Sequence, residues 1–547
     1  MLALLLSWIF SFVIFSALGC FMQKNILRLS EPKPLSILLN GMFLYMLMVW
    51  ISLYFTGFGL YFQIGAFIVS LGILNYYKNT CNPLWFILEQ WKLLAPWQRW
   101  LTPVIFIVLL GVSAQSFYLP DNESYYIQTI KWANEQGFVF GLINLHQFLW
   151  QFSGWHILQA GVNLHNPLFT ANALNAFLFF FFVYWVVFDR RNQYPFWLKL
   201  TGLMMPVLMF FIPVPSPDLA VWLLSLLIFD LFIKNFKQTT SENLLQISIW
   251  VFFSLLIKLT AILNLLLLFI LWYRHRHKAR NLSIQLALLS LLTAYLWLTK
   301  NYIITGYLWY PFDLMASMIP SEWRYPHELM QYMAELGKRE NLVLDVHDFT
   351  ASLKHWVWPA RFPDKFFNPL LLLLIFIFPF VINYRRPKTE DSRAYLSLYL
   401  SGLIFFVIFL FVGANMRFFF GLFMFLALIV IVFLGAGLGK KFMYILSIVS
   451  LLCCLLFILG RSAFSSGMFI KPQTSALPDR IESHHAENLK FFSLENEAYF
   501  WETGDAPLPA AHVEMIEFFK QNFDYLPQRN KRGFYNKSLK KNDERNK

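Results

Sequence analysis

Charged residues are scarce in this chain. Only 14% of its 547 residues are Asp, Glu, Lys or Arg, whereas 58% are hydrophobic and 19% are aromatic. A soluble globule cannot hide that much apolar surface from water, so the composition excludes a soluble protein and predicts a polytopic membrane protein. The formal net charge of +13 comes from Lys and Arg that are spread over short loops between apolar runs. Because they form no single basic patch, we expect no nucleic-acid partner.

Cysteine is equally scarce, with four residues in the chain. Cys20, Cys453 and Cys454 lie inside apolar runs, and Cys81 lies in a loop that we expect in the cytoplasm. Disulfide frameworks belong mainly to small exported domains and are rare in reducing compartments. The sequence therefore predicts no disulfide framework.

Two further features are missing: a basic segment ahead of the first apolar run, and an internal repeat. In the run from Met1 to Met22 the first positive charge, Lys24, follows the apolar residues. This order predicts an uncleaved first span with its N-terminus outside. No repeat or heptad pattern is evident, so the sequence does not favour an inverted-repeat transporter.

What the chain does have is a succession of apolar runs. About 20 apolar residues cross the hydrocarbon core of a bilayer, and on that basis we predict an all-α polytopic membrane protein of about fourteen spans. They lie near 2–22, 35–55, 58–76, 100–118, 167–188, 196–212, 219–233, 243–273 (two short helices), 282–302, 367–383, 395–413, 418–437 and 442–460. The strongly basic short loops all fall on one side of this arrangement, which places both termini outside.

The predicted spans divide the chain into three parts. Residues 1–99 hold the N-terminal extra spans and a cytoplasmic loop. Residues 100–460 form the transmembrane core, with long outer loops at about 119–166 and 303–365, and residues 461–547 form a small outer C-terminal tail. Because the tail is too small for an independent catalytic domain, we expect any chemistry in the core.

The first long polar interruption follows the span near 100–118 and contains Asp121 and Glu123. A carboxylate at the edge of an apolar span loses solvation, so its pKa rises and it becomes a useful general base, or a metal ligand if it is paired. The alternative is a solvated cap on the helix that begins near Ser124. Asp121 is the stronger catalytic candidate of the two.

Other residues of this first loop are candidates for substrate binding. Lys131 lies within two helical turns of the carboxylates, where it is suited to pair with them or to bind a phosphate. Tyr126 and Trp155 stand among aromatic residues of the kind that gather at a membrane interface without any further role. Asn144 and His146 lie further along the loop, and a lone interfacial histidine is more often structural than functional.

Three more charges lie within or at the outer ends of apolar spans. Asp218 follows a Pro-rich turn, where a role at a helix N-terminus alone would explain it. Lys258 interrupts the run 243–273, and Arg417 precedes the span near 418–437. A cation beside lipid costs free energy unless an anion or carbonyl groups receive it, or unless it snorkels to the headgroups. A carboxylate base facing two such cations is what transfer from a lipid phosphate to a hydroxyl requires.

The second outer loop favours a lipid partner. It contains the aromatic stretch Tyr307-Leu-Trp-Tyr-Pro-Phe312, an amphipathic segment near 322–337, and Trp356-Val-Trp-Pro359. Such segments lie flat in the membrane interface, either to wall a groove for a long lipid or only to anchor the loop. Asp345-Val-His-Asp348 resembles a metal-ligand cluster, but no second cluster accompanies it, so a loop cap is favoured.

Several of these motifs occur together in one known superfamily. They are the acidic first outer loop, the broken helix pair with a lysine at its tip, Gly306-Tyr-Leu-Trp-Tyr-Pro-Phe312 and the late Arg417-Phe418. Together they resemble the GT-C superfamily of polytopic glycosyltransferases. A closer likeness, over about residues 100–510, is to a family of uncharacterised bacterial multi-spanning membrane proteins. It rests on Tyr126-Ile-Gln-Thr-Ile-Lys-Trp132, Gly141-Leu-Ile-Asn-Leu-His146, Ser216-Pro-Asp-Leu219 and Ala506-Pro-Leu-Pro509.

The resemblance implies a GT-C-like helical bundle in a bacterial plasma membrane. It implies transfer of a sugar from a polyprenyl-phosphate-linked donor to a glycan or lipid-linked acceptor on the outer face. An acidic residue of the first outer loop then serves as base or as ligand of a divalent metal, and Asp121 is the position that matches. The resemblance leaves open the sugar, the acceptor, the need for a metal and the oligomeric state.

Two departures from the closer family keep other functions open. That family has an Arg after the Asn-Leu-His where this chain has Phe148, and an Asn-Ser-Ser-Trp where it has Phe152-Ser-Gly-Trp155. A changed substrate or an inactive assembly subunit would fit these departures. A transporter or flippase of a lipid-linked saccharide is the other alternative, although its charges would lie deep in several spans rather than at one boundary.

Overall fold

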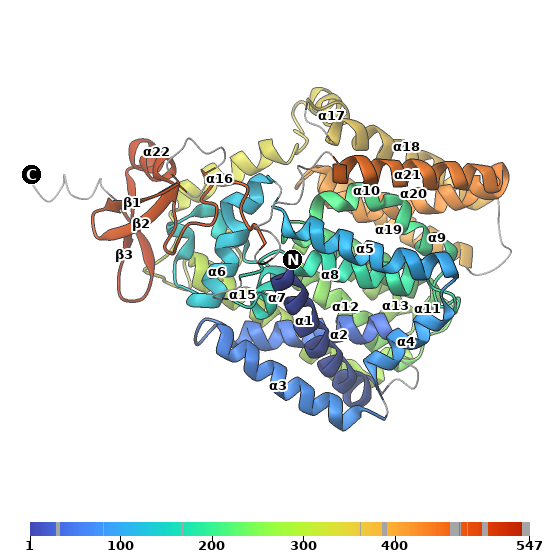
Figure 1. The fold of residues 1–547 in the computed structure, drawn as a ribbon. Helices are drawn as coiled ribbons and strands as arrows, with labels where there is room; N and C mark the ends of the chain where they lie inside the picture. The colour runs from blue at the N-terminus through green and yellow to red at the C-terminus, as the bar shows by residue number, and fades with distance from the viewer. Residues whose placement is uncertain are drawn as a thin grey trace, which may run out of the picture.

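The computed structural model describes residues 1–28, 33–79, 81–116, 118–165, 169–360, 363–384, 391–459, 470, 472–477, 480–494 and 501–538. This part of the chain is mostly helical (Figure 1). It contains helices that are long and apolar enough to cross a membrane, and by that measure the prediction of a polytopic helical membrane protein is confirmed. They are Leu2–Leu27, Pro34–Ser52, Leu60–Tyr77, Pro96–Ala114, Ser283–Thr305, Asp364–Asn383, Ser392–Leu410, Met416–Leu438 and Lys441–Ile458.

The helices keep the order that the apolar runs predict. The α-helices of the first half are α1 (Leu2–Phe21), α2 (Pro34–Ser52), α3 (Leu60–Tyr77), α4 (Pro83–Leu93), α5 (Pro96–Ala114), α6 (Ile127–Glu135), α7 (Gly154–Val162), α8 (Ala173–Phe182), α9 (Phe196–Lys199), α10 (Met205–Leu208) and α11 (Pro217–Asn235). Those of the second half are α12 (Ser241–Ile257), α13 (Ile262–Arg274), α14 (Arg276–Asn281), α15 (Ser283–Thr305), α16 (His327–Glu340), α17 (Phe349–Val357), α18 (Asp364–Tyr384), α19 (Asp391–Leu410), α20 (Met416–Leu438), α21 (Lys440–Leu459) and α22 (Val513–Phe523).

Short π- and 3-10 helices extend or connect these elements. They are η1 (Met22–Leu27), η2 (Asn122–Tyr126), η3 (Leu142–Asn144), η4 (Gln147–Gln151), η5 (Val183–Val187), η6 (Leu200–Met204), η7 (Met209–Phe211) and η8 (Leu259–Ala261). The strands are β1 (Ile481–Ala486), β2 (Leu489–Leu494), β3 (Tyr525–Arg529) and β4 (Phe534–Ser538).

The predicted span near 196–212 is not one continuous helix. It consists of α9, η6, α10 and η7 in succession. Gly202 lowers helix propensity and Pro206 lacks an amide hydrogen, so both weaken a continuous α-helical ladder through this run. The predicted hairpin at 243–273, by contrast, is present: α12 ends at Lys258, whose backbone is extended, and α12 and α13 contact each other.

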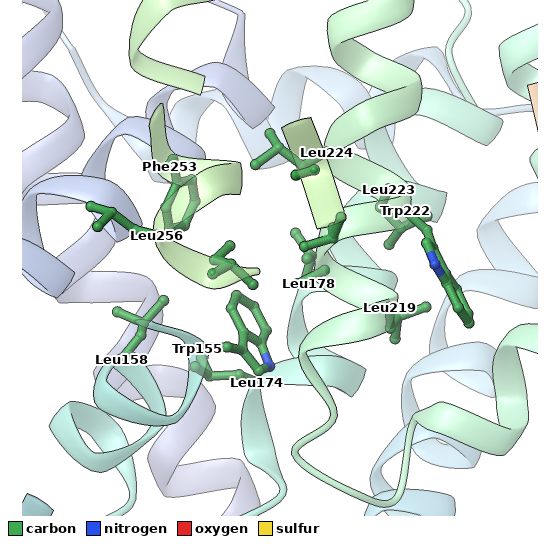
Figure 2. Close-up of a cluster of buried hydrophobic side chains, with 14 of the residues drawn as sticks. Trp155, Leu158, Leu174, Leu178, Leu219, Trp222, Leu223, Leu224, Phe253 and Leu256 are labelled. Carbon is green, nitrogen blue, oxygen red and sulfur yellow. The ribbon is translucent and has the colours of Figure 1, made fainter. Parts of the chain in front are cut away.

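The core of the bundle lies where α7, α8, α11 and α12 meet. Large apolar side chains from all four helices are buried there, among them Trp155, Leu178, Trp222 and Phe253 (Figure 2). Moving such a side chain from water into a protein interior is worth roughly 1.5–3 kcal/mol. Between membrane helices, however, close packing contributes most of the stability. The core therefore fixes the ends of α11 and α12, and the charged residues at those ends with them.

The basic loops gather at one end of the bundle. Lys33 and Lys234 both donate to the carbonyl oxygen of Gln193, at 3.3 and 2.8 Å. Arg274 donates to the carbonyl oxygen of Phe236 at 2.6 Å. Loops that are far apart in sequence thus meet at this end, as the charge pattern predicts; Arg385, Arg386 and Lys388 belong to the same prediction but lie outside the described residues.

Helix α11 connects this basic end to the opposite end of the bundle. It begins beside Asp218, ends beside Lys234, and at about 1.5 Å per residue is roughly 28 Å long.

The C-terminal tail covers the end of the bundle opposite the basic loops. The tail contains two antiparallel hairpins, β1–β2 and β3–β4, together with α22. It lies next to α6 and α16 (Figure 1), and its residues Phe492 and Gly533 form isolated bridges to Ala510 and Phe140.

The prediction that no disulfide forms is wrong. Cys20 and Cys81 are bonded, with their Cα atoms 5.9 Å apart. Helices α1 and α3 contact each other, which brings the end of α1 and the loop after α3 together although 61 residues separate the two cysteines. Sequence spacing alone cannot predict this approach, because it depends on how two spans pack.

Helices α1 and α2 approach so closely that only glycine fits at their contact. A Cβ atom added at Gly41 would overlap the backbone of Phe15, and one added at Gly19 would overlap the backbone of Ile37. Small residues permit this kind of approach between membrane helices. We expect Gly41→Leu to lower the free energy of unfolding by about 3 kcal/mol or more, measured in mixed detergent micelles. Gly72→Leu is the control, because a side chain there meets open space; equal losses from both variants would contradict the prediction.

Candidate functional site

Two ion pairs lie at the end of the bundle that the tail covers. In the first, the Nη1 atom of Arg417 donates to Oδ2 of Asp121 at 2.6 Å. Asp121 stands at the start of the π-helix η2, just after α5, and Arg417 stands in the first turn of α20. The two residues are 296 positions apart in sequence, so the fold alone brings them together.

The second ion pair joins Lys258 to Asp218. The Nζ atom of Lys258 donates to Oδ1 of Asp218, and Oδ2 of Asp218 accepts from the hydroxyl of Ser216 at 3.3 Å. Lys258 stands at the tip of the α12–α13 hairpin, and Asp218 in the first turn of α11. A cation at this position would be costly without an anion, and Asp218 supplies one.

The two pairs form one cluster. The ring of Phe418 faces both cations, with its centroid 5.1 Å from Nζ of Lys258 and 5.4 Å from Cζ of Arg417. Electrostatic interactions also cross between the pairs, since Arg417 interacts with Asp218 as well as with Asp121. We call Asp121, Asp218, Lys258 and Arg417 the charged cluster.

Local sequence explains why the cluster residues point to the same place. Ser216 caps α11 and Pro217 begins it, while Asn415 caps α20 by accepting from the amide of Arg417 at 3.1 Å. These capping residues fix where each helix starts. The indole of Trp222 then donates to the carbonyl oxygen of Arg417 at 3.0 Å and ties α20 to α11.

Three of the four residues of the charged cluster are partly exposed. The side chains of Asp121 and Arg417 are 16% and 33% exposed, and that of Lys258 is 19% exposed. The side chain of Asp218 is only 3% exposed. Asp218 therefore holds Lys258 from beneath, whereas the other three residues of the cluster have surface free for a ligand.

Buried aromatic residues form the wall behind Asp121. The hydroxyl of Tyr126 donates to Oδ2 of Asp121 at 3.3 Å, and burial raises the pKa of Tyr126, so this hydroxyl keeps its proton. The ring of His156 lies 4.8 Å from that of Tyr126. Burial lowers the pKa of His156 to about 3, which keeps the imidazole neutral. Neither residue adds charge to the cluster.

Glu123 and Lys131 bind the C-terminal tail rather than facing the charged cluster. The carboxylate of Glu123 accepts from the hydroxyl of Ser475 at 2.5 Å and from the amide of Ala476 at 3.0 Å, and burial raises its pKa. Lys131 donates to the carbonyl oxygen of Asp505 at 2.8 Å and forms an ion pair with its carboxylate. Both side chains are thus occupied by the tail.

Asn144 and His146 also bind the tail. The amide of Asn144 donates to the carbonyl oxygen of Phe534 at 3.3 Å and accepts from the side chain of Asn536 at 2.9 Å. The Nε2 atom of His146 lies 2.8 Å from the carbonyl oxygen of Trp501. Glu123, Lys131, Asn144 and His146 together form what we call the tail seat.

Trp155 lies in the core beneath the charged cluster. Its indole donates to the side chain of Asn175 at 2.8 Å, and Asn175 in turn donates to the carbonyl oxygens of Val214 at 2.7 Å and Ser216 at 3.0 Å. Trp155 is fully buried. It supports the turn that leads to Asp218, and the structure places it out of reach of a ligand.

The tail seat predicts how stability changes with pH. Burial lowers the pKa of His146 to about 4, below the ordinary value of 6.5. Between pH 6.5 and 4 the unfolded chain therefore binds the proton more readily, so the free energy of unfolding falls as the pH falls. The free energy of unfolding is measured from pH 7.5 to 4. We expect its loss over this range to be smaller in His146→Gln than in the wild type, by on the order of 2–3 kcal/mol. An unchanged slope would contradict it; replacing the exposed His347 is the control.

One family matches most of this chain. The family described as "Domain of unknown function (DUF8201)" matches residues 1–424. The chain belongs to this family. Neither the curated proteins nor the solved structures contain a match.

The DUF8201 match runs from α1 into α20. It contains all four residues of the charged cluster and all four residues of the tail seat, while the hairpins β1–β2 and β3–β4 lie beyond it. The match also begins before the predicted transmembrane core at 100–460, so the first three spans belong to the DUF8201 unit. The boundary near residue 99 stays a prediction.

Sequence reasoning missed three residues that shape the site. Asn175 gave no signal beyond its place in an apolar run, and Phe418 entered only as the neighbour of Arg417 in a motif, without a role of its own. Lys300 did give one, because a cation inside the span Ser283–Thr305 is costly in lipid. It is 5% exposed, donates to the carbonyl oxygen of Phe152 at 3.1 Å, and interacts electrostatically with His156 beside the cluster.

The described residues do not form a metal site. In the ranges that the structure describes, no group of three His, Cys, Asp or Glu side chains is placed to hold a metal ion. The two carboxylates of the charged cluster already face cations. Asp348, part of the predicted ligand-like motif, caps α17 instead by accepting from the amide of Ala351 at 3.4 Å.

Proposed function

We propose that this protein is a membrane glycosyltransferase that transfers a sugar from a polyprenyl-phosphate-linked donor to an acceptor hydroxyl. One observation carries the proposal: two carboxylates and two cations from four separate segments meet at one end of a bundle of membrane helices, and three of the four are partly exposed. Placing charges there costs free energy that packing alone would not repay. A ligand that is both anionic at its head and apolar along its length matches this position.

The proposed reaction uses each member of the charged cluster. The donor phosphate binds Arg417 and Lys258 and draws Arg417 away from Asp121, which leaves the carboxylate of Asp121 free to accept a proton. Asp121 takes the proton of the acceptor hydroxyl while that oxygen bonds to the anomeric carbon of the sugar. The bond from this carbon to the phosphate oxygen breaks, and its electron pair leaves with the lipid phosphate, whose charge the two cations stabilise. The configuration at the anomeric carbon inverts.

The second outer loop supplies a surface for the lipid in this proposal. Large apolar side chains between α15 and α16 are exposed, namely Trp309, Phe312, Leu314, Met315 and Met318. They directly follow the membrane helix Ser283–Thr305. Exposed aromatic and apolar residues at the end of a span are typical of a segment that lies in the membrane interface. The polyprenyl chain would run along this segment towards the charged cluster.

We further propose that the charged cluster faces the outside of a bacterial plasma membrane. The basic loops at the other end support this orientation through the positive-inside rule. We expect a membrane-impermeant maleimide added to intact cells to label Lys531→Cys, in the tail, and not Lys92→Cys, at the basic end. Both variants are made after the four native cysteines are replaced by alanine.

The reverse labelling would overturn the proposed orientation. It would also agree with the disulfide between Cys20 and Cys81 at the basic end, because disulfides are rare in the cytosol.

The function itself is tested with purified protein in lipid vesicles. The assay follows a labelled sugar from a polyprenyl-phosphate-linked donor to an acceptor hydroxyl. Loss of transfer in Asp121→Asn supports the assignment of the base, and transfer at a near wild-type rate removes it. No observation in the structure specifically favours the transporter or the inactive subunit.

A further inference from the structure

A separate apolar groove lies along the side of the bundle. Its walls come from α1, α3, α4, α5 and α8, and its volume is about 450 Å³, within the roughly 300–1,000 Å³ of small-molecule sites. Its lining includes Trp8, Leu74, Phe106 and Phe181. Apart from three residues at one end, Lys78, Cys81 and Asn82, every lining residue is apolar.

The groove opens towards the lipid phase. Ile9 and Leu71 line it and are 51% and 46% exposed, and both belong to helices that are candidate membrane spans. A cavity with so few polar groups does not hold ordered water, so hydrocarbon is the filling that the lining favours. On α1 the lining runs from Leu5 to Val13, roughly 12 Å of helix. This length is close to the about 15 Å that one leaflet contributes to the hydrocarbon core.

Charge identifies the kind of lipid. Lys78 stands at the polar end of the groove and makes no ion pair within the described parts of the chain. Over residues 1–88 the sequence has one acidic residue, Glu31, against the four cations Lys24, Arg28, Lys33 and Lys78. Basic residues beside a span attract anionic headgroups with about 1 kcal/mol each. The bond between Cys20 and Cys81 holds α1 against the loop after α3 at this end.

We infer that the groove binds one hydrocarbon chain of an anionic bilayer phospholipid, with the phosphate of the headgroup at Lys78. The site is distinct from the charged cluster, and it does not depend on the proposed transfer reaction. The chain lies between α1 and α3 and fills the space that these helices leave open. An anionic headgroup is preferred over a zwitterionic one because, among the described residues, no acidic side chain forms an ion pair with Lys78.

Native mass spectrometry of the full-length protein tests this inference. The protein is purified in mild detergent and equilibrated with equimolar dioleoyl phosphatidylglycerol and dioleoyl phosphatidylcholine. We expect the wild type to retain phosphatidylglycerol in preference. Leu74→Trp, which fills the groove, is expected to reduce the retained phosphatidylglycerol at least fivefold. Lys78→Gln is expected to remove the preference while a lipid chain is still retained.

Matched variants control for effects outside the groove. Ile68→Trp changes an exposed position of the same helix outside the groove, and Lys338→Gln removes a charge from an exposed position elsewhere; both should behave as the wild type. If Leu74→Trp does not fold, Leu71→Trp serves instead, because Leu71 is half exposed. Wild-type retention in a folded groove-filling variant, or an unchanged preference in Lys78→Gln, would overturn the inference. So would displacement of phosphatidylglycerol by an equal concentration of polyprenyl phosphate.

Discussion

Asp121→Asn is expected to lower the rate of sugar transfer by about two to four orders of magnitude, the range that a positioned general base contributes. Asparagine keeps the shape of the side chain and can still accept from Arg417, but it cannot take the proton of the acceptor hydroxyl. The hydrogen bond of 2.6 Å between Arg417 and Asp121 also shows that this carboxylate is held in place before any ligand binds. The measurement is the initial rate in vesicles at saturating donor.

The control for this prediction is an acid at the other end of the bundle that is also paired with a cation. Asp230 is 2% exposed and accepts from Lys234 at 2.6 Å, at the basic end of the bundle. Asp230→Asn removes one charge from a similar environment without touching the charged cluster, so transfer should continue at close to the wild-type rate. Similar rates for both variants would show that Asp121 has no special role.

Lys258→Met is expected to lower the free energy of unfolding by about 3–5 kcal/mol, because it leaves the carboxylate of Asp218 buried without its cation. Asp218 is 2% exposed, so water cannot replace the lysine. In the double variant Lys258→Met/Asp218→Asn no charge is left behind, and we expect most of the loss to be recovered. The measurement is unfolding in mixed micelles over the full double-mutant cycle.

The coupling energy of that cycle decides the prediction. If Lys258 and Asp218 stabilise each other, the cycle gives a coupling energy of at least about 2 kcal/mol. If they act independently, the losses of the two single variants add and the coupling energy is close to zero. Lys338→Met, at an exposed position, should change stability by less than about 0.5 kcal/mol. If the losses in the free energy of unfolding at Lys258 and Asp218 simply add, the ion pair does not account for the contribution of either residue to stability.

The coarse fold could be predicted because lipid imposes a simple rule on sequence. A membrane helix needs a long apolar run, so runs such as 2–22 and 418–437 are visible without any structure. The break at Lys258 was visible for the same reason, since a cation in the middle of an apolar run must find a partner. The disulfide of Cys20 depends on packing between spans, and no local pattern encodes that.

The charged cluster was partly predictable on the same physical basis. Asp121, Asp218, Lys258 and Arg417 each stood out as a charge beside apolar residues, and the structure brings them together. Their catalytic and binding roles stay predictions. Glu123 gave the same local signal as Asp121, but it binds Ser475, 352 residues further along the chain. The sequence offered no way to foresee that the tail folds back onto these residues.

The departure at Phe148 concerns the tail rather than the charged cluster. The ring of Phe148 is buried and lies 5.9 Å from that of Trp501, in the tail segment that His146 also contacts. An apolar residue here matches an apolar partner in the tail. The side chain at position 148 therefore helps to hold the tail.

The most direct test of the proposed function asks whether the bond between sugar and lipid phosphate is broken. Purified protein in sealed vesicles is supplied with a polyprenyl-phosphate-linked sugar that carries label in both the sugar and the lipid, together with an acceptor. The proposed function predicts that the two labels separate, with the sugar on the acceptor, and that Asp121→Asn prevents this. Movement of the doubly labelled lipid between leaflets with no separation of the labels would contradict it.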